Sequence, residues 1–222
     1  MNMWWLFLFV PLSYLMGSIS FGFLISKFKL KKDVRTCGSG GTGATNMLRT
    51  FGAKWAWLVF FLDIFKGTLA TLMGLFVFGG FSYSFNPMVA FTDTAGQIGM
   101  YACGLASIVG HCFPVWTGFR GGKGTATAMG VLFVINPAIA FAGFVLAFAY
   151  GIPFGHASVA SIMFITLVVL WESLVRSPGI AVSVILVGYY VLILFTHRAN
   201  IKRILTEREP RTALFKKKKK VT

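Results

Sequence analysis

The chain has 222 residues, of which 56% are hydrophobic and 12% are charged. Soluble globular domains carry roughly 25% charged residues, so the composition excludes a soluble domain and indicates an integral membrane protein. The 21 Lys and Arg exceed the 6 Asp and Glu, which gives a formal net charge of +15. Most of these cations lie in polar segments between or after apolar ones, where the positive-inside rule accounts for them. We therefore expect no nucleic-acid partner.

Six apolar segments, each a candidate for crossing a bilayer, follow one another along the chain: 3–26, 55–80, 95–117, 124–151, 157–171 and 178–196. The first begins without basic residues and is longer than the core of a cleaved signal peptide, so we interpret it as a retained span. Six crossings would place the first basic loop and the basic C-terminus on opposite sides of the membrane, which the positive-inside rule disfavours.

The fourth apolar segment resolves this conflict, because it is long and carries Asn136-Pro137 at its centre, where a helix should break. Split there, it either crosses twice or forms a re-entrant pair, and both alternatives put all the basic loops on one side. The sequence thus predicts an all-α, polytopic membrane protein with about seven transmembrane helices, the fourth and fifth of them short. We expect a single domain over residues 1–222.

The same charges predict the orientation: the N-terminus outside, and the basic loops and the C-terminus in the cytoplasm. Residues 198–222 form a basic amphipathic tail, and its Lys216–Lys220 run is expected to attach to anionic lipid at about 1 kcal/mol per charge. Arg176 is then the lone cation facing outward, and the outward loop at 81–94 is uncharged apart from Asp93.

Two polar loops, residues 38–49 and 118–125, are rich in glycine and contain Arg49, Arg120 and Lys123. Small residues let several backbone N–H groups converge on one anion, and Arg and Lys add bidentate and point-charge contacts. We therefore predict phosphate binding at the membrane surface. The expected phosphate-binding residues of these loops are Gly38, Gly40, Gly43, Thr45, Asn46, Arg120, Gly121 and Gly122.

Several familiar site classes do not fit these loops. Gly38-x-Gly40-x-x-Gly43 matches a dinucleotide-binding string but lies between membrane spans, and Gly122-Lys123 lacks the leading Gly and the following Ser or Thr of a Walker A loop. The three cysteines have no zinc or disulfide spacing. Glycines within the apolar segments are expected to allow close helix packing instead: Gly17, Gly22, Gly74 and Gly130.

Polar residues in or beside the apolar segments have two interpretations each. Asp63 and Lys66 share one helical face and are either a self-neutralising pair or a functional one. His197 and Asn200, at the end of the last span, either cap a helix end or belong to a site.

Six motifs in fixed order carry a resemblance that covers nearly the whole chain. They are Gly17-Ser18-Ile19-Ser20-Phe21-Gly22, then residues 38–49, Asp63-Ile64-Phe65-Lys66-Gly67, Gly110-His111-Cys112-Phe113-Pro114, residues 119–124, and His197-Arg198-Ala199-Asn200-Ile201-Lys202-Arg203. The chain resembles the bacterial acyl-phosphate:glycerol-3-phosphate acyltransferases. The resemblance implies a seven-helix bacterial inner-membrane enzyme with a cytoplasmic active site and no cofactor or metal.

The implied reaction moves a fatty acyl group from acyl phosphate to the 1-hydroxyl of glycerol 3-phosphate, giving lysophosphatidic acid and phosphate. The implied catalytic residues are Ser39, Arg49, Lys123, His197, Asn200 and Glu209, and Ser158 and Ser161 match a serine pair of the family. Gly41 and Gly155 stand where the family has Asn and Arg.

From these positions we expect Arg49, Lys123 and His197, with one of the two serines, to hold the glycerol phosphate, while Ser39 and the backbone of 38–46 hold the acyl phosphate. Asn200 and Glu209 would orient these partners. The glycerol hydroxyl is expected to attack directly and lose its proton to a substrate phosphate oxygen or to His197. The expected partners are the two substrates and the anionic bilayer, with the chain a monomer. The alternative functions are a small transporter of an organic phosphate and a structural membrane subunit.

Overall fold

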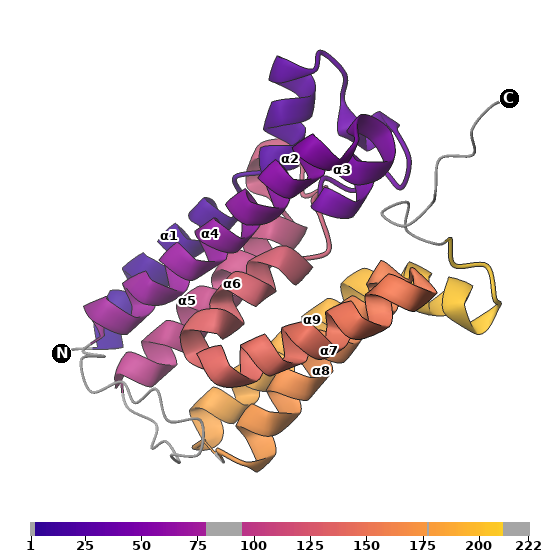
Figure 1. Ribbon diagram of the computed structural model, residues 1–222. Coiled ribbons are helices and arrows are strands. Elements are labelled where there is room, and N and C mark those ends of the chain that lie inside the picture. Colours follow the sequence, from indigo (N-terminus) through magenta and orange to yellow (C-terminus); the bar gives the residue numbers. More distant parts are fainter. Residues whose placement is uncertain (1–2, 79–94, 177, 211–222) are drawn as a thin grey trace, which may run out of the picture.

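The computed structural model of the chain describes residues 3–78, 95–176 and 178–210, and the regular elements within these ranges are helical (Figure 1). This confirms the all-α prediction for the described part of the chain. The predicted outward loop with Asp93 and residues 211–222 of the expected basic tail lie outside the described residues.

The first apolar segment is a broken helix. α1 (Leu6–Gly17) is followed by α2 (Phe21–Leu24), which continues as a π-helical turn over Ile25–Lys29. Together they form one candidate membrane span of 24 residues. A side chain on Gly17 would collide with the Ser107 carbonyl of α5, and one on Gly22 with the Thr42 carbonyl.

The middle of the chain forms three helices. α3 (Ala44–Phe51) is short, α4 (Ala53–Val77) and α5 (Ala95–Cys112) are candidate spans, and Gly52 at φ +89° turns the chain between α3 and α4. Gly74 packs directly on the Gly99 carbonyl of α5. Gly130 packs in the same way on Ile64 of α4. The prediction of close helix packing is thus confirmed for Gly17, Gly74 and Gly130, whereas Gly22 packs on a loop carbonyl.

The fourth apolar segment breaks at the predicted place. α6 (Thr125–Ile135) ends before Asn136, and α7 (Pro137–Phe154) begins with Pro137 at its first position. The Asn136 side chain accepts a hydrogen bond from the Ile139 amide at 3.3 Å and so caps α7. α6 has 11 residues and α7 has 18. α8 (Ala157–Leu174) and α9 (Ile180–Leu205) complete the chain, and both are candidate spans.

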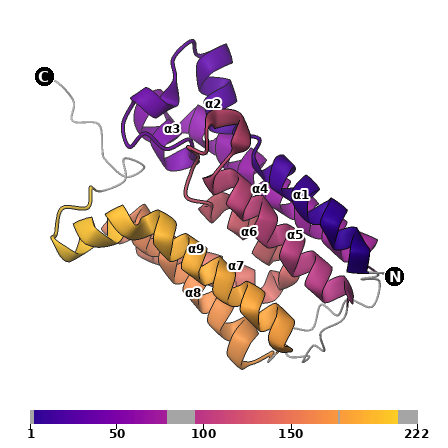
Figure 2. The ribbon, with the colours of Figure 1, turned by 180° about the vertical axis from the view of Figure 1, so that it is seen from behind.

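Two groups of helices form the bundle (Figures 1 and 2). α1, α4, α5 and α6 pack together, α7, α8 and α9 pack beside them, and contacts of α5 with α9 and of α6 with α7 join the groups. Apolar side chains from both groups meet in one core, among them Leu132 on α6, Phe164 on α8 and Leu186 on α9. The five long apolar helical segments identify an integral membrane protein.

A polar cluster, which we name the distal cluster, lies inside this bundle at the α6–α7 break: Tyr101, Asn136, Glu172 and Arg176. The Glu172 carboxylate accepts hydrogen bonds from Tyr101 and Asn136, both at 2.7 Å, and from Arg176 at 3.4 Å. Arg176 also donates to the Ile135 carbonyl at 3.3 Å. The position of Arg176 on the outer side of the membrane stays a prediction. Its side chain is buried, because Glu172, one helical turn earlier, pairs with it.

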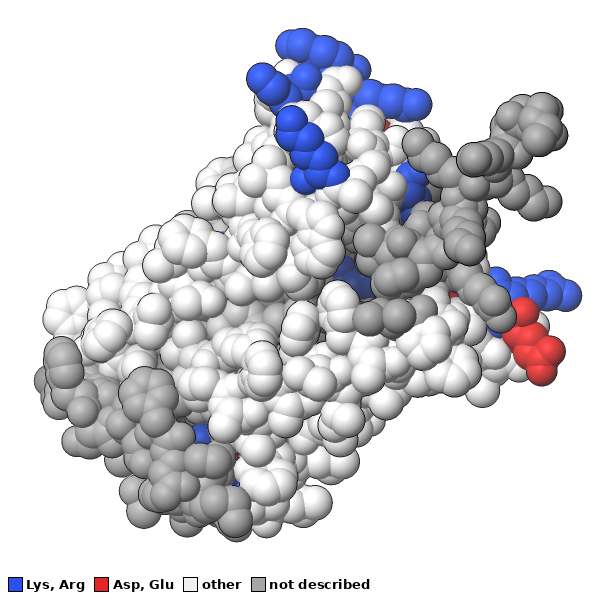
Figure 3. Space-filling model, viewed as in Figure 1, with Lys and Arg blue, Asp and Glu red and all other residues white. Residues whose placement is uncertain are grey.

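Exposed cations gather at the opposite end of the molecule, over α2 and α3 and their flanking loops (Figure 3). The exposed lysines of this region are Lys27, Lys29, Lys31, Lys32 and Lys54. The described part of the flank in Figure 3 is mostly uncharged, which suits contact with lipid.

Candidate active site

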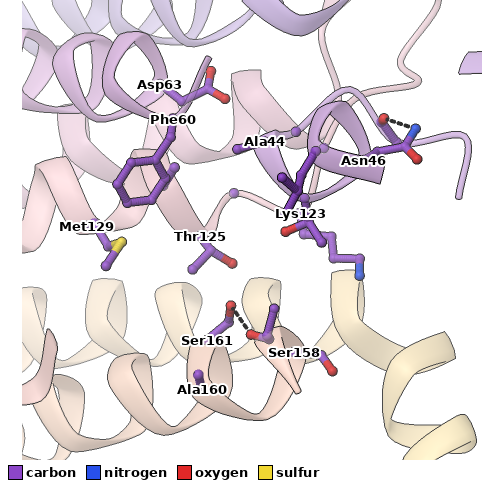
Figure 4. A pocket seen from close by; sticks show the side chains of 18 of the residues that line it. Ala44, Asn46, Phe60, Asp63, Lys123, Thr125, Met129, Ser158, Ala160 and Ser161 are labelled. Carbon is purple, nitrogen blue, oxygen red and sulfur yellow. Dashed lines mark hydrogen bonds between the residues drawn. The ribbon is translucent and has the colours of Figure 1, made fainter. Parts of the chain in front are cut away.

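A cavity of about 270 Å³ opens between the two helix groups at the cationic end of the bundle (Figure 4). Most of the predicted site residues line this pocket: Ser39, Gly43, Thr45, Asn46, Arg49, Gly122, Lys123, Ser158, Ser161, His197, Asn200 and Glu209. They come from both glycine-rich loops, α3, α8, α9 and the segment after α9. The fold thus gathers residues separated by up to 170 positions, from Ser39 to Glu209, into one site.

Asn46 organises the first glycine-rich loop. Its Oδ1 accepts the Ser39 amide at 2.9 Å, and its Nδ2 donates to the Gly41 and Cys37 carbonyls at 2.8 and 3.0 Å and to the Val34 carbonyl at 3.2 Å. The amide group of Asn46 is therefore committed to the loop, although we had predicted that it contacts phosphate. The Ser39 amide is committed in the same way, which leaves the Ser39 hydroxyl as the group of that residue available to a ligand.

The end of this loop is the N-terminus of α3. Gly43, Ala44 and Thr45 line the pocket there, and Arg49, on the last turn of α3, lies on the same wall. A helix N-terminus presents unpaired N–H groups and a partial positive charge. The first loop thus offers an anion both backbone dipoles and a guanidinium.

Lys123 projects into the pocket from the second loop (Figure 4). The loop is fixed on both sides of this residue, since the Gly122 amide donates to the His111 carbonyl at 3.1 Å and Thr196 Oγ1 donates to the Lys123 carbonyl at 3.0 Å. Gly124 adopts φ +84°, so the chain reverses directly after Lys123. The pKa of Lys123 is lowered to about 8, mainly by burial; the charge of Glu209 raises this pKa, and the charges of Arg203 and Arg49 lower it.

Four predicted phosphate-binding residues do not line the pocket. Gly38 and Gly40 adopt positive φ angles of +56° and +71° in the turn, where Gly38 packs on the Asn46 side chain. Gly121 packs on the His111 carbonyl. Arg120 is exposed outside the cavity. These glycines shape the loops, and Arg120 does not reach the site in this structure.

Glu209 joins the C-terminal segment to α8 and α9. Its Oε1 accepts hydrogen bonds from Asn200 at 2.6 Å and from Ser158 at 2.8 Å, and its Oε2 pairs with Arg203 at 2.8 Å. Burial would raise the pKa of Glu209, but these three hydrogen bonds outweigh it, and the pKa is lowered. Glu209 therefore remains a carboxylate at neutral pH and positions its neighbours.

His197 and Ser161 lie on the pocket wall, and each side chain forms a hydrogen bond to the backbone of its own helix. His197 Nδ1 lies 2.9 Å from the Ile193 carbonyl, one turn earlier in α9. This bond makes Nδ1 the protonated nitrogen and leaves Nε2 as the acceptor. Ser161 donates to the Ala157 carbonyl at 2.7 Å.

The charges of the pocket are not balanced. Glu209 pairs with Arg203, and within the described residues no carboxylate forms an ion pair with Arg49 or Lys123. Lys123 is half-buried and Arg49 is exposed, and cations at a cavity that form no ion pair favour an anionic ligand there. Among the described residues, no group of three or more His, Cys, Asp and Glu side chains comes together as a metal site.

The inner part of the same cavity is apolar, which sequence reasoning did not assign to particular residues. Phe60, Met129 and Phe164 line it, together with Phe144, Ala147, Phe148 and Gly151 of α7. The α7 residues follow the i, i+3, i+4, i+7 spacing of one helix face, as do Ala157, Ala160, Ser161 and Phe164 of α8. That spacing is a signal from which these two walls could have been found. Asp63 and His111 also border the pocket.

Comparison with known proteins identifies the family of the chain. The family model described as "Glycerol-3-phosphate acyltransferase" matches residues 7–207. The chain is 40% identical over 203 residues to the glycerol-3-phosphate acyltransferase of Aquifex aeolicus (strain VF5), covering 91% of this chain and 96% of the relative. It is 38% identical over 198 residues to glycerol-3-phosphate acyltransferase 2 of Bacillus anthracis, covering 89% and 94%.

Two solved structures share the fold. One is PlsY (YgiH), an integral membrane glycerol 3-phosphate acyltransferase, in its glycerol 3-phosphate form, at 37% identity and a TM-score of 0.80 over 92% of this chain and 94% of that one. The second is the lysophosphatidic acid form of PlsY, at 36% identity and a TM-score of 0.77 with the same coverage. The chain therefore belongs to the glycerol-3-phosphate acyltransferase family of integral membrane proteins.

Proposed function

We propose that this protein transfers a fatty acyl group from acyl phosphate to the 1-hydroxyl of glycerol 3-phosphate. The products are 1-acylglycerol 3-phosphate, which is lysophosphatidic acid, and inorganic phosphate. One observation carries the proposal: one cavity joins Arg49 and Lys123, which form no ion pair with a carboxylate of the described residues, to an apolar chamber between helices. Such a cavity suits two phosphorylated substrates, one with a long hydrocarbon chain and one that is small.

The cationic part would hold the two substrate phosphates. Lys123, Arg49 and His197 Nε2 bind the glycerol phosphate, and the Ser39 hydroxyl, which also lines the pocket, is directed to the acyl phosphate. The N-terminus of α3 and the first loop face the acyl phosphate. This arrangement compensates the charge of two dianions that must come close together.

The apolar part would hold the acyl chain of the donor. Phe144 and Phe148 on α7 and Phe164 on α8 form walls on which the chain lies while its phosphate remains at the cationic end. The carbonyl carbon is then held at the junction, next to the glycerol hydroxyl. Alignment of this kind supplies up to about 7–11 kcal/mol in favourable cases.

The transfer itself needs little further activation, because acyl phosphate is a mixed anhydride with a good leaving group. The 1-hydroxyl oxygen forms a bond to the carbonyl carbon, and the bond from that carbon to the phosphate oxygen breaks. The hydroxyl proton moves to a phosphate oxygen of the substrate or to His197 Nε2. Glu209 acts on the neighbours of the substrate, since it orients Asn200 and Ser158.

The topology that suits this function has seven helices, with α1 and α2 as one of them. Thr125 at the start of α6 and Gly151 near the end of α7 both border the pocket, while the break between them lies beside Glu172. This supports a hairpin that enters from the pocket side and returns to it. The 11 residues of α6 extend about 16 Å, so α6 crosses only part of the roughly 30 Å apolar layer.

The cations around the pocket support a cytoplasmic active site in a bacterial inner membrane, with the N-terminus outside. They also favour anionic lipid around the pocket entrance. The proposed unit is a monomer, because the pocket of one chain contains every group that the mechanism uses.

The test uses the protein purified in lipid with palmitoyl phosphate and glycerol 3-phosphate, and follows the release of phosphate and the formation of lysophosphatidic acid. We expect turnover that requires both substrates and is lost in Lys123→Ala. A parallel reaction replaces the donor with acyl-CoA, and turnover with acyl-CoA alone would overturn the donor assignment. A folded protein with no turnover on either donor would contradict the enzyme and favour the transporter alternative.

A further inference from the structure

A second group of ionisable side chains lies beneath the two glycine-rich loops, and we name it the Asp63 cluster: Asp63 and Lys66 on α4 and His111 at the end of α5. Their side chains are nearly inaccessible, with exposed fractions of 2%, 4% and 5%. Lys66 Nζ lies 2.9 Å from Asp63 Oδ1, and His111 Nδ1 lies 3.4 Å from the same oxygen. The cluster therefore connects two helices, whereas a pair that only neutralised itself would involve α4 alone.

Burying these groups is costly unless they are paired and well bonded. The ion pair with Lys66 compensates the negative charge of Asp63. His111 then adds a second buried polar group, which neither the ion pair nor the packing of the helices requires. The sequence left open whether Asp63 and Lys66 form a simple ion pair or a functional one. The contacts of His111 and Lys66 with the surrounding backbone favour the second alternative.

His111 supports the second glycine-rich loop directly. Its carbonyl accepts the Gly122 amide at 3.1 Å, and its ring edge at Nε2 lies so close to Gly122 that a side chain at that position would collide with it. Gly121 packs on the same carbonyl. Because the other ring nitrogen of His111 faces Asp63, the orientation of the ring depends on that carboxylate. The residue that follows Gly122 is Lys123.

Lys66 reaches the supports of the first loop. Its Nζ donates to the Ile19 carbonyl at 2.8 Å, in the break between α1 and α2. Three residues further on, Gly22 packs against the Thr42 carbonyl of the first loop. One buried cluster thus touches the backbone that holds each of the two loops.

We propose that Asp63, Lys66 and His111 are positioning residues that fix the two loops relative to each other, and that they act mainly through His111 and Gly122 on Lys123. Asp63 and His111 also border the inner pocket, but the role that we assign to the three residues is to hold the supports of the loops. The proposal rests on the proposed function only in the role it gives Lys123, namely to hold a substrate phosphate. The positioning itself can be measured without turnover.

The first test measures backbone hydrogen exchange across residues 118–125 in the full-length protein in lipid. Asp63→Asn and His111→Ala are expected to speed exchange there, because the first disturbs and the second removes the His111 ring that packs on Gly122. His111→Asn keeps a nitrogen near the position of Nδ1 and should restore part of the protection. The matched control is Glu172→Gln, an equally buried carboxylate in the distal cluster, which should leave this segment unchanged.

The second test measures kcat/KM for glycerol 3-phosphate in a double-mutant cycle. His111→Ala alone should lower kcat/KM roughly 10- to 100-fold, because a displacement of about 1 Å costs that much. In the Lys123→Ala background the same change should cost less than about threefold, since the two residues act through one contact. Full additivity would overturn the proposal.

The hydrogen exchange separates this proposal from the proposed function. Unchanged exchange in Asp63→Asn and His111→Ala would overturn the positioning role even in an active enzyme. An equal increase in Glu172→Gln would also overturn it, because the effect would then be general loosening of the bundle. Faster exchange confined to the Asp63 and His111 variants would support positioning even if the wild type proved inactive on acyl phosphate.

Discussion

The bundle contains two polar regions that lie far apart on α8, the pocket near Ser158 and the distal cluster near Glu172. The 14 positions between these residues correspond to about 21 Å of helix. In the distal cluster the Glu172 carboxylate has three partners and balances the charge of Arg176. In the pocket Glu209 is equally well bonded, but Lys123 and Arg49 form no ion pair among the described residues.

The difference shows how buried charge separates structure from function in this protein. A cluster that closes on itself stabilises the fold and offers nothing to a ligand. A cluster with excess charge at the mouth of a cavity needs an anion to complete it. Both regions contain a carboxylate that bonds an amide and a guanidinium, so it is the remaining charge that distinguishes them.

The largest expected effect is on stability and concerns the distal cluster. Glu172→Ala removes the carboxylate that pairs with the buried Arg176, and breaking a buried pair in this way costs roughly 3–5 kcal/mol. We expect a clear loss of thermal stability with an unchanged KM for glycerol 3-phosphate in the protein that remains folded. A higher KM without a loss of stability would mean that the distal cluster acts on the site.

The next largest effect is on activity and concerns the pocket. Lys123→Ala removes a cation from the substrate phosphate and should lower kcat/KM by roughly 10²–10³, as for the loss of one preorganised electrostatic contact. Thermal stability should change little, because within the described ranges Lys123 forms no ion pair that the substitution would break. Lys202→Ala, an exposed cation on α9 outside the pocket, is the control and should retain wild-type activity.

The pH dependence sharpens the same contrast. The pKa of Lys123 is lowered to about 8, so the side chain is charged below this value and becomes neutral as the pH rises through it. The KM for glycerol 3-phosphate should rise about tenfold between about pH 7 and about pH 9, where roughly a tenth of the side chain stays charged. In Lys123→Arg, whose side chain stays charged throughout, the profile should be flat over that interval. A parallel rise in both proteins would assign the titration to another group.

A smaller effect is expected at Ser158. Ser158→Ala removes one hydrogen bond to Glu209, worth about 1.5–3 kcal/mol for a charged partner, while Asn200 and Arg203 retain theirs. We expect kcat/KM to fall about tenfold in steady-state assays. Ser161→Ala removes only a bond to the Ala157 carbonyl and should have a smaller effect. The reverse order would mean that Ser161, and not Ser158, contacts the substrate.

The sequence predicted much of this architecture from residues with strong local preferences. Asn136-Pro137 marked the helix break because proline cannot continue the hydrogen bonds of a helix. The glycines in apolar segments marked the close helix contacts. Twelve of the sixteen residues predicted for the site line one cavity, because the motifs that carried the resemblance occur at its walls.

The remaining features depend on contacts between distant segments, which local patterns do not encode. The sequence around Asn46 does not show that the side-chain amide bonds to its own loop. The sequence around Arg176 does not show that its side chain bonds to the Ile135 carbonyl at the end of α6. The contact of Ser158 with Glu209 spans 51 positions. Side-chain direction decided whether Arg120 and Asn46 are available to a ligand, and the sequence specifies it only through the whole fold.

The most direct test of the central claim is the equilibrium binding of glycerol 3-phosphate to the protein in lipid, measured by calorimetry for the wild type, Lys123→Ala and Glu172→Gln. We predict binding to the wild type, at least about tenfold weaker binding to Lys123→Ala, which is 1.4 kcal/mol or more, and unchanged binding to Glu172→Gln. Equal affinity of the wild type and Lys123→Ala would contradict the claim that the excess charge of the pocket binds the substrate phosphate.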